Sequence, residues 1–183
     1  MSDILQRTLS SLAFLDAGGA VARGPGAGGA NAGGAGGGLG GLVRALCAAT
    51  SKQEEEAVVR RELASLKEQM ASPLTTVRDL RECLSRAVYC ETLGYSAPFA
   101  HIHSVNLAQR GSLAQRRSGY LAACLLLDED HELMVMMVNT IIKDLQGGGV
   151  LELSMALGAV SQLATAQLAP TLLALVLEKT RHG

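Results

Sequence analysis

The sequence predicts an all-α protein in which pairs of helices stack on one another, and three observations support this prediction. Apolar residues recur at helical spacing through most of the chain after Leu42. Aromatic residues make up only 3% of the chain and Trp is absent, which suits closely packed helices better than a β-sandwich. Helix pairs start near Thr76, Ser112 and Val150, a repeat of about 37 residues that is close to the HEAT or armadillo period. We therefore expect an α-solenoid of HEAT- or armadillo-like helix pairs.

The stretch from Arg117 to Leu145 contains two helical patterns with a polar break between them. The apolar face of the first pattern carries Tyr120, Leu121, Cys124, Leu125 and Leu127. The apolar face of the second carries Leu133, Met136, Met137, Thr140, Ile141 and Leu145. Two such helices form an αα-hairpin, which cannot bury both apolar faces alone and therefore needs similar hairpins stacked on either side.

The composition argues against several classes of protein. With 183 residues and 48% hydrophobic side chains, the chain can fill one sizeable core. Its formal net charge of −1 argues against nucleic-acid binding through a general basic surface. No apolar run approaches the roughly 18 to 20 residues that span a bilayer, and the start of the chain, with Asp3, lacks the cationic region of a secretory signal. These features favour a cytosolic protein.

Residues 1–41 are expected to form a flexible N-terminal segment. The part up to Leu15 could form a short amphipathic helix, and the part that follows is mostly Gly and Ala, the composition of a disordered linker. A Gly-x-Gly-x-x-Gly match inside this linker includes Pro25 and has no strand before it, so it does not indicate a dinucleotide site. The ordered part of the chain is therefore expected to span residues 42–183.

The first long helix is predicted to run from Ser51, which forms a capping box with Glu54, to about Met70. Its buried face is expected to carry the stripe Val59, Leu63, Leu66 and Met70. On the other face Glu56 and Arg60 have the spacing of a helical ion pair, and we interpret that face as a solvated surface.

The next two helices are bounded by Pro and Gly. Ser72 and Pro73 provide the start signal of one helix, and Gly94 its C-terminal stop. Its buried side is expected to include Leu80, Leu84, Ala87 and Val88. A further helix is expected between Pro98 and Gly111.

Three more helix starts follow. Ser112 and Gln115 form a second capping box at the beginning of the central hairpin. Beyond the hairpin, the glycines at 147–149 predict a turn, residues 150–163 a helix, and Pro170 the start of the last helix.

Histidines and cysteines could hold a metal, but their spacing argues against it. His101 and His103 lie two apart on a predicted helix, so they point to different faces. The cysteines show none of the paired spacing of a zinc or redox site, and we expect all of them to be reduced and buried: Cys47, Cys83, Cys90 and Cys124. No metal or other cofactor is expected.

The other polar and sulfur-bearing groups also have structural interpretations. The run from Asp128 to Glu132 occupies the turn inside the hairpin, where Asp130 is expected to cap the second helix, and no nucleophile accompanies it. The methionines at helical spacing are expected to fill the core rather than form an adaptable binding stripe: Met134, Met136 and Met137. No combination of residues indicates an enzyme.

Two segments carry a resemblance to a known family. RRSGYLAACLLLDEDHELMVMMVNTIIKDL resembles the adaptins, the large subunits of clathrin-adaptor-type complexes, whose stretch has the form K/R-R-x-G-Y-L-x-x-x-L-L-L-D-E followed by T-N-x-I-x-x-D-L. The preceding LGYSAPFAHIHSVNLAQ is similar to the family's L-G-Y-x-x-x-F-G segment, with Ala100 at a position where many relatives have Gly. The resemblance covers residues 42–183.

The resemblance implies a non-enzymatic subunit of a heterotetrameric coat complex in vesicle-mediated transport. Its partners would be a β-type large subunit, a medium subunit and a small subunit, and the complex would collect cargo through sorting signals. An Arf-type GTPase would recruit it to the cytosolic face of a membrane as a peripheral protein. The adaptin type that the chain resembles most implies the trans-Golgi network and transport toward endosomes. A complete adaptin trunk is much longer, so we expect the chain to represent its N-terminal part.

The resemblance also places a partner contact and leaves an alternative. In adaptins that bind Arf through this subunit, apolar residues at helix N-termini make the contact, and the matching positions are Ile102, Val105 and Met136. The same three residues have the periodicity of ordinary core residues.

Two departures from the family limit what the resemblance implies. Cys47 stands where dileucine-binding relatives have a basic residue, so the resemblance does not support that cargo site. Relatives that bind phosphoinositide through this subunit have a lysine cluster, whereas the matching stretch here has only Arg81, with Arg78 nearby, so a lipid site is not supported either. The alternative function is a free-standing helical-repeat scaffold or transport-receptor fragment.

Overall fold

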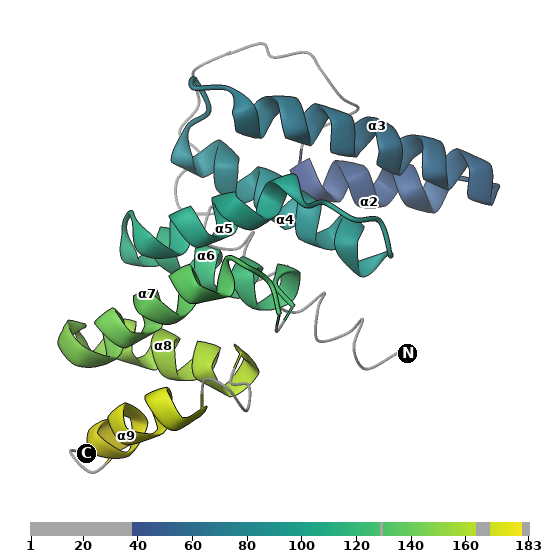
Figure 1. Cartoon of the computed structure of the whole chain (residues 1–183). Coiled ribbons are helices and arrows are strands. Elements are labelled where there is room, and N and C mark those ends of the chain that lie inside the picture. Colours follow the sequence, from purple (N-terminus) through teal and green to yellow (C-terminus); the bar gives the residue numbers. More distant parts are fainter. Residues whose placement is uncertain (1–37, 129, 164–168, 181–183) are drawn as a thin grey trace. The chain divides into compact units, whose positions relative to one another are not determined.

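The computed structural model describes residues 38–128, 130–163 and 169–180, and all regular structure in these ranges is α-helical (Figure 1). The helices are α2 (Gly38–Ala48), α3 (Lys52–Ala71), α4 (Val77–Thr92), α5 (Phe99–Gln109), α6 (Leu113–Leu126), α7 (Met134–Gly147), α8 (Val150–Leu163) and α9 (Ala169–Thr180). This confirms the predicted all-α class. The predicted N-terminal helix and most of the Gly-rich linker lie outside the described residues. None of the described helices combines the length and apolar character needed to cross a membrane.

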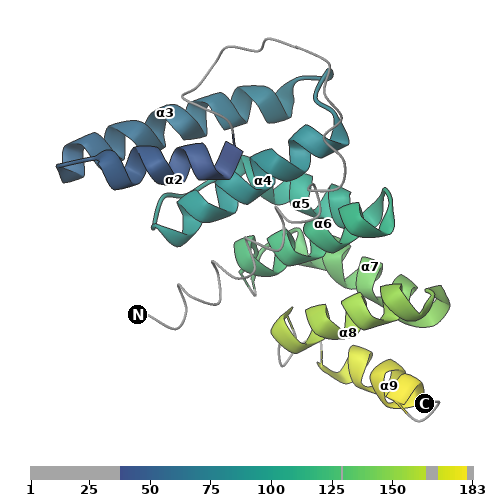
Figure 2. The ribbon, with the colours of Figure 1, turned by 180° about the vertical axis from the view of Figure 1, so that it is seen from behind.

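The chain forms two compact units, which meet in sequence between Ala100 and His101. In the first unit, α2, α3 and α4 all pack against one another, and Figures 1 and 2 show α2 lying alongside α3. Helix α2 begins at Gly38, slightly before the predicted ordered start at Leu42. One buried cluster in this unit joins the three helices through Leu42, Val59 and Cys90.

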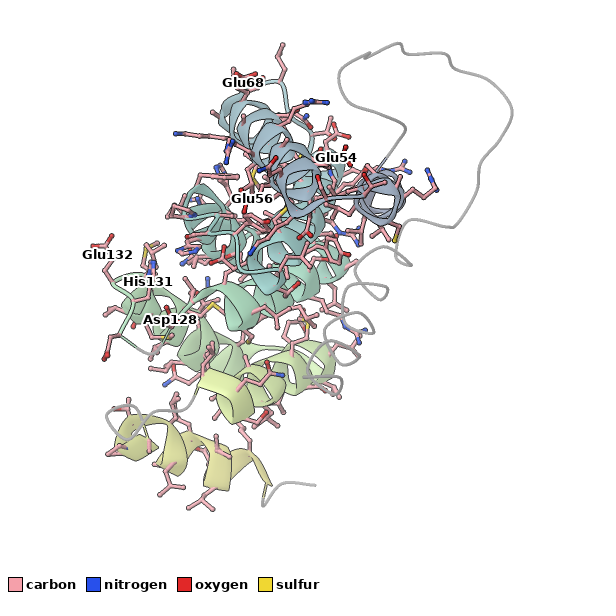
Figure 3. The ribbon with its side chains drawn as sticks, turned by 90° about the vertical axis from the view of Figure 1, so that its right-hand side faces the viewer. Glu54, Glu56, Glu68, Asp128, His131 and Glu132 are labelled. Carbon is pink, nitrogen blue, oxygen red and sulfur yellow. The ribbon has the colours of Figure 1, made fainter. Side chains whose placement is uncertain are left out.

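Helix α3 has the apolar stripe that the sequence predicts. Val59 and Leu66 are fully buried, Met70 is 5% exposed, and Leu63 is half-buried. The opposite face is charged, and Figure 3 shows Glu54, Glu56 and Glu68 along this helix. Glu56 and Arg60 form the predicted ion pair at 3.9 Å.

One of the two hydrogen bonds of the predicted capping box is present at the N-terminus of α3. The Ser51 hydroxyl accepts from the Glu54 N–H at 3.2 Å. The Glu54 carboxylate, however, accepts from the N–H and the hydroxyl of Thr50, at 2.8 and 2.9 Å, one residue earlier than a standard box. The Thr50 backbone hydrogen bond is the main reason that the pKa of Glu54 is lowered.

The predicted helix start at Ser72 and Pro73 is wrong. Ser72 instead ends α3, because its N–H donates to the Gln69 carbonyl at 3.2 Å. Helix α4 begins after Thr76, whose hydroxyl accepts from the Asp79 N–H at 3.2 Å while the Asp79 carboxylate accepts from the Thr76 N–H at 3.4 Å. This reciprocal capping box satisfies two of the backbone donors at the start of α4.

The C-terminal end of α4 agrees with the sequence. Gly94 follows the cap residue with a φ of 93°, a left-handed conformation that favours glycine. Leu84, Ala87 and Val88 are buried as predicted, whereas Leu80 is only half-buried.

The second unit has the packing of a helical repeat. Helix α8 packs against both α6 and α7, and α9 packs against α7. Helices α4, α6 and α8 begin at Val77, Leu113 and Val150, as the predicted repeat requires. Because α6 with α8, and α7 with α9, are one repeat apart, equivalent helices stack on each other, which confirms the α-solenoid.

Most helix boundaries in this unit were predictable. The Gln115 side-chain oxygen accepts from the Ser112 N–H at 2.7 Å, which is the backbone bond expected of the second capping box. Helix α8 has the predicted bounds, and α9 begins at Ala169, just before Pro170. The glycines at 147–149 form the connection from the end of α7 to the start of α8.

One buried cluster of the second unit includes residues of all five helices. Its members from α5 to α7 include Val105, Ala108, Tyr120, Ala123, Met134, Met137, Ile141 and Leu145. Gly119 lies where α5 and α6 cross, since a Cβ atom there would lie 2.2 Å from the Ala108 nitrogen. The two backbones are therefore in direct contact at this crossing, and only glycine leaves room for it.

Candidate functional site

A buried polar network connects four helices of the second unit. Asp144 of α7 is 4% exposed, and its Oδ2 accepts from the Tyr120 hydroxyl of α6 at 2.6 Å. Arg116 of α6 donates to the same oxygen and, through Nε, to the Ala108 carbonyl of α5 at 3.1 Å. Glu152 of α8 lies 4.0 Å from the Arg116 guanidinium. The charge of Asp144 is thus paired inside the stack.

The chemistry of this network is structural. Burial, followed by the Asp144 hydrogen bond, raises the pKa of Tyr120, so its hydroxyl remains a proton donor at neutral pH. Tyr120 donates to Asp144, and Arg116 donates to Asp144 and to the Ala108 carbonyl, so both side chains tie α6 to neighbouring helices. The residues that carry the adaptin resemblance, Arg116, Gly119, Tyr120 and Asp144, therefore join helices to one another.

The loop between α6 and α7 contains an interaction that the sequence did not indicate. His101 Nδ1 lies 2.9 Å from His131 Nε2, and the two rings meet edge to face at 71°. The Leu133 N–H donates to His131 Nδ1 at 3.1 Å, so a neutral His131 carries its proton on Nε2 and donates it to His101. This contact fixes the loop to the start of α5. The partner of His101 is thus His131, whereas His103, whose pKa is lowered by burial, takes no part in the pair.

The predicted N-cap at Asp130 is wrong. Helix α7 begins at Met134 with Leu133 as its cap residue, and Asp130 is an exposed turn residue. The turn is held by the His131 N–H, which donates to the Asp128 carbonyl at 3.1 Å, and by the His131 ring. Figure 3 shows Asp128, His131 and Glu132 gathered on this loop. Across residues 38–128, 130–163 and 169–180, no three His, Cys, Asp or Glu side chains are grouped so that they could hold a metal ion.

The three residues predicted to contact a GTPase do not share one exposed surface. Ile102 and Met136 are 38% and 37% exposed, but Val105 is fully buried in the cluster that also holds Met134 and Met137. Val105 therefore has the core position that its periodicity indicates, because it lies on the inner side of α5. Two of the three methionines fill the core as expected. Sequence periodicity missed Val135, which is 68% exposed beside Met136.

The cysteines differ in their surroundings. All four are free thiols: Cys83 and Cys90 are buried, Cys124 is half-buried, and Cys47 is exposed. The prediction that all of them are buried is wrong for Cys47, which lies near the end of α2. Burial raises the pKa of Cys90 and of Cys124 to about 12.

We expect one thiol of the native chain to react quickly with a disulfide reagent such as DTNB. Cys47 should be modified first because it is exposed, whereas the buried thiols are shielded and hold few thiolates at neutral pH. Mass spectrometry of the modified chain would identify the site, and Cys47→Ser should remove the fast phase. Equal rates at all cysteines under native conditions would contradict the packing described here. Denaturation provides the control, since it should expose every thiol.

Comparison with known proteins places this geometry in a family. The model of the adaptin N terminal region matches residues 55–181. AP-4 complex subunit epsilon-1 of Homo sapiens is 44% identical over 183 residues, which is 100% of this chain and 16% of that relative. AP-4 complex subunit epsilon of Arabidopsis thaliana is 38% identical over 141 residues, 77% of this chain and 15% of that relative.

A relative of another adaptor complex is also matched over only a small share of its own length. AP-2 complex subunit alpha of Schizosaccharomyces pombe is 33% identical over 118 residues, 64% of this chain and 13% of that relative. The chain thus spans only a small part of the length of these relatives.

Proposed function

This chain belongs to the adaptin family, and from that premise we propose that it is a non-enzymatic subunit of a heterotetrameric adaptor complex in vesicle-mediated intracellular protein transport. Its large-subunit type is epsilon-like. We propose that the complex contains a β-type large subunit, a medium subunit and a small subunit. It sorts cargo at the cytosolic face of the trans-Golgi network toward endosomes as a peripheral membrane coat.

One observation carries this proposal. The 44% identity with the epsilon-1 subunit of the human AP-4 complex extends over all 183 residues. The structure is consistent with a structural subunit, because Arg116, Tyr120 and Asp144 use their polar groups to join helices to one another. A stacked helical repeat presents long surfaces to partner proteins, which suits a complex subunit.

Co-purification tests the proposal. An affinity-tagged chain expressed in cells should bring down a β-type large subunit, a medium subunit and a small subunit in comparable amounts. A matched tag on an unrelated helical-repeat protein serves as the control. Purification of the chain without any of the three subunits would favour the alternative, a free-standing helical-repeat scaffold or transport-receptor fragment.

We also propose that an Arf-type GTPase contacts an apolar surface made by Ile102, Val135 and Met136. The three side chains are exposed by 38%, 68% and 37% and lie in the first turns of α5 and α7. The His101–His131 contact holds the start of α5 to the loop that leads into α7. Val105 supports this surface from the core and does not contact the partner. Exposed apolar patches of this kind are common at protein interfaces.

Substitution of this surface should separate partner binding from folding. We expect Ile102→Asp together with Met136→Asp to weaken GTP-dependent Arf binding by at least about tenfold, since the charges oppose an apolar contact, while the adaptor complex still assembles. Pull-down with Arf in its GTP and GDP forms gives the measurement. Leu74→Asp is the control, because Leu74 is 88% exposed in a turn of the first unit.

A third variant distinguishes the core residue from the surface residues. Val105→Asp should unfold the second unit, because it places a charge in a fully buried position. Undiminished Arf binding by the Ile102 and Met136 double variant would show that the partner contacts another surface.

A further inference from the structure

An apolar groove with a volume of about 280 Å³ lies between α6 and α8. Its lining residues extend over about three turns of each helix, which corresponds to a length of about 17 Å. The residue at one end, Leu151, is 60% exposed. The apolar walls include Leu113, Leu121, Cys124, Leu151, Met155 and Ala159.

Gly158 leaves a hole in the α8 wall of this groove. The residue is exposed, and a Cβ atom added to it meets nothing within 4 Å apart from the backbone of its own helix. Glycine inside a helix is less favourable than alanine, and in the part of the chain that the structure describes no close packing requires it here, in contrast to Gly119. Such a hole can receive a large side chain from another helix.

The groove also has an electrostatic preference. Among the described residues that line it, Arg117 is the only charged one. An apolar helix with a carboxylate at its edge therefore complements the groove, whereas a helix with Lys or Arg at that place would be repelled.

The outer face of α9 has these properties. Leu173 and Leu177 are 58% and 46% exposed and lie four residues apart, so they form one apolar stripe. Glu178 lies at the edge of this stripe with 58% of its side chain exposed. Its contact with the adjacent Lys179, at 3.7 Å, is a partly exposed ion pair of the kind that contributes little. The 12 residues of α9 span about 18 Å, which matches the length of the groove.

We propose that two copies of this chain bind each other by placing the α9 stripe of one copy in the α6–α8 groove of the other. Arg117 and Gly158 lie about one and two turns after the starts of equivalent helices, so about one turn separates them along the groove. Slightly more than one turn separates Leu173 from Glu178 on α9. An antiparallel α9 therefore brings Leu173 to the hole at Gly158 and Glu178 to Arg117 at the same time.

Sedimentation velocity of the full chain over a range of concentrations measures this association. We expect the mass to rise above that of one copy as the concentration increases. Gly158→Gln should weaken association at least about tenfold, because it fills the hole with a polar side chain that suits a helix. Ser161→Gln is the matched control, since Ser161 is exposed on α8 outside the groove.

The stripe is tested in the same way. Leu173→Gln together with Leu177→Gln should also weaken association at least about tenfold, because it removes the apolar contact. Leu74→Gln is the control for general apolar attraction, since Leu74 is 88% exposed in the first unit.

A charge exchange tests the orientation of α9. Glu178→Arg alone should weaken association, since it places two cations together. Adding Arg117→Glu to the same chain should restore association by reversing both charges. If the double exchange were as weak as Glu178→Arg alone, with helix content unchanged by circular dichroism, the proposed orientation would be wrong.

A mixing experiment separates this contact from aggregation. Each copy has one groove and one stripe, so the Gly158→Gln chain and the double stripe variant should each remain single copies but form a one-to-one dimer when mixed. No dimer in the mixture would overturn the proposal, as would equal losses in the groove variant and its Ser161→Gln control. An unmodified chain that stays a single copy up to about 1 mM would overturn it too. Loss of an adaptor subunit from the Gly158→Gln chain during co-purification would then assign the groove to that subunit.

Discussion

Replacing Gly119 with Ala is expected to destabilise the second unit by at least about 3 kcal/mol. A Cβ atom at this position would lie 2.2 Å from the Ala108 nitrogen and 2.6 Å from the Leu107 carbonyl carbon. Both are backbone atoms, so no change of rotamer relieves the clash. Helices α5 and α6 must separate, which opens the cluster that contains Val105 and Tyr120. Urea unfolding followed by circular dichroism measures the loss, and hydrogen exchange locates it.

A second glycine provides the control for this substitution. A Cβ added at Gly158 of α8 meets nothing within 4 Å apart from the backbone of its own helix, so Gly158→Ala only exchanges a poor helix former for a good one. This change should stabilise the chain by about 0.5 to 1 kcal/mol. If both alanine variants were equally stable, or if hydrogen exchange showed the loss in the first unit, the close crossing of α5 and α6 would not be the cause.

The helices could be predicted because their signals are local. Helix α8 has the bounds that its apolar periodicity indicates, and the Gly94 and Ser112 boundaries follow from residues that favour one backbone conformation or one capping bond. The wrong helix start at Ser72 also comes from local signals. Ser72 and Thr76 can both cap a helix, and the sequence alone does not show that Thr76 forms the reciprocal hydrogen bonds with Asp79.

The candidate sites were harder to predict because they depend on contacts between distant residues. Nothing in the spacing of His101 indicates that His131 lies 2.9 Å away, and this pair replaces Asp130 as the feature that holds the loop. Periodicity identifies an apolar residue but does not decide whether it is covered. Val105 is buried, whereas Met136, which has the same helical spacing, remains 37% exposed.

The adaptin resemblance identified important residues without indicating their role. Gly119 permits the crossing of α5 and α6, and Tyr120 and Arg116 bring their donors to Asp144. In the sequence Arg116 and Asp144 are 28 residues apart. Their common role becomes visible only when the hairpin folds and the end of α7 meets the start of α6.

Replacing Asp144 with Ala is expected to cost about 3 to 5 kcal/mol of stability. The Asp144 side chain is 6% exposed and the Arg116 side chain 17%, so the variant leaves the Arg116 charge largely buried without its main partner. Tyr120 also loses the acceptor for its hydroxyl, which carries a further cost of desolvation. Urea unfolding of Asp144→Ala beside the unmodified chain measures the total loss.

Two further variants separate the charge pair from the other contacts of Asp144. Glu152→Gln should cost less than about 1 kcal/mol, because the Glu152 carboxylate is 28% exposed and lies 4.0 Å from Arg116. Combining Asp144→Leu with Arg116→Leu should recover part of the stability that Asp144→Ala loses, since an apolar pair leaves no uncompensated charge. If the double variant were less stable than Asp144→Ala, the buried ion pair itself would be a net source of stability. A loss below about 1 kcal/mol for Asp144→Ala would instead show that water reaches Arg116 and that the network does not hold the stack together.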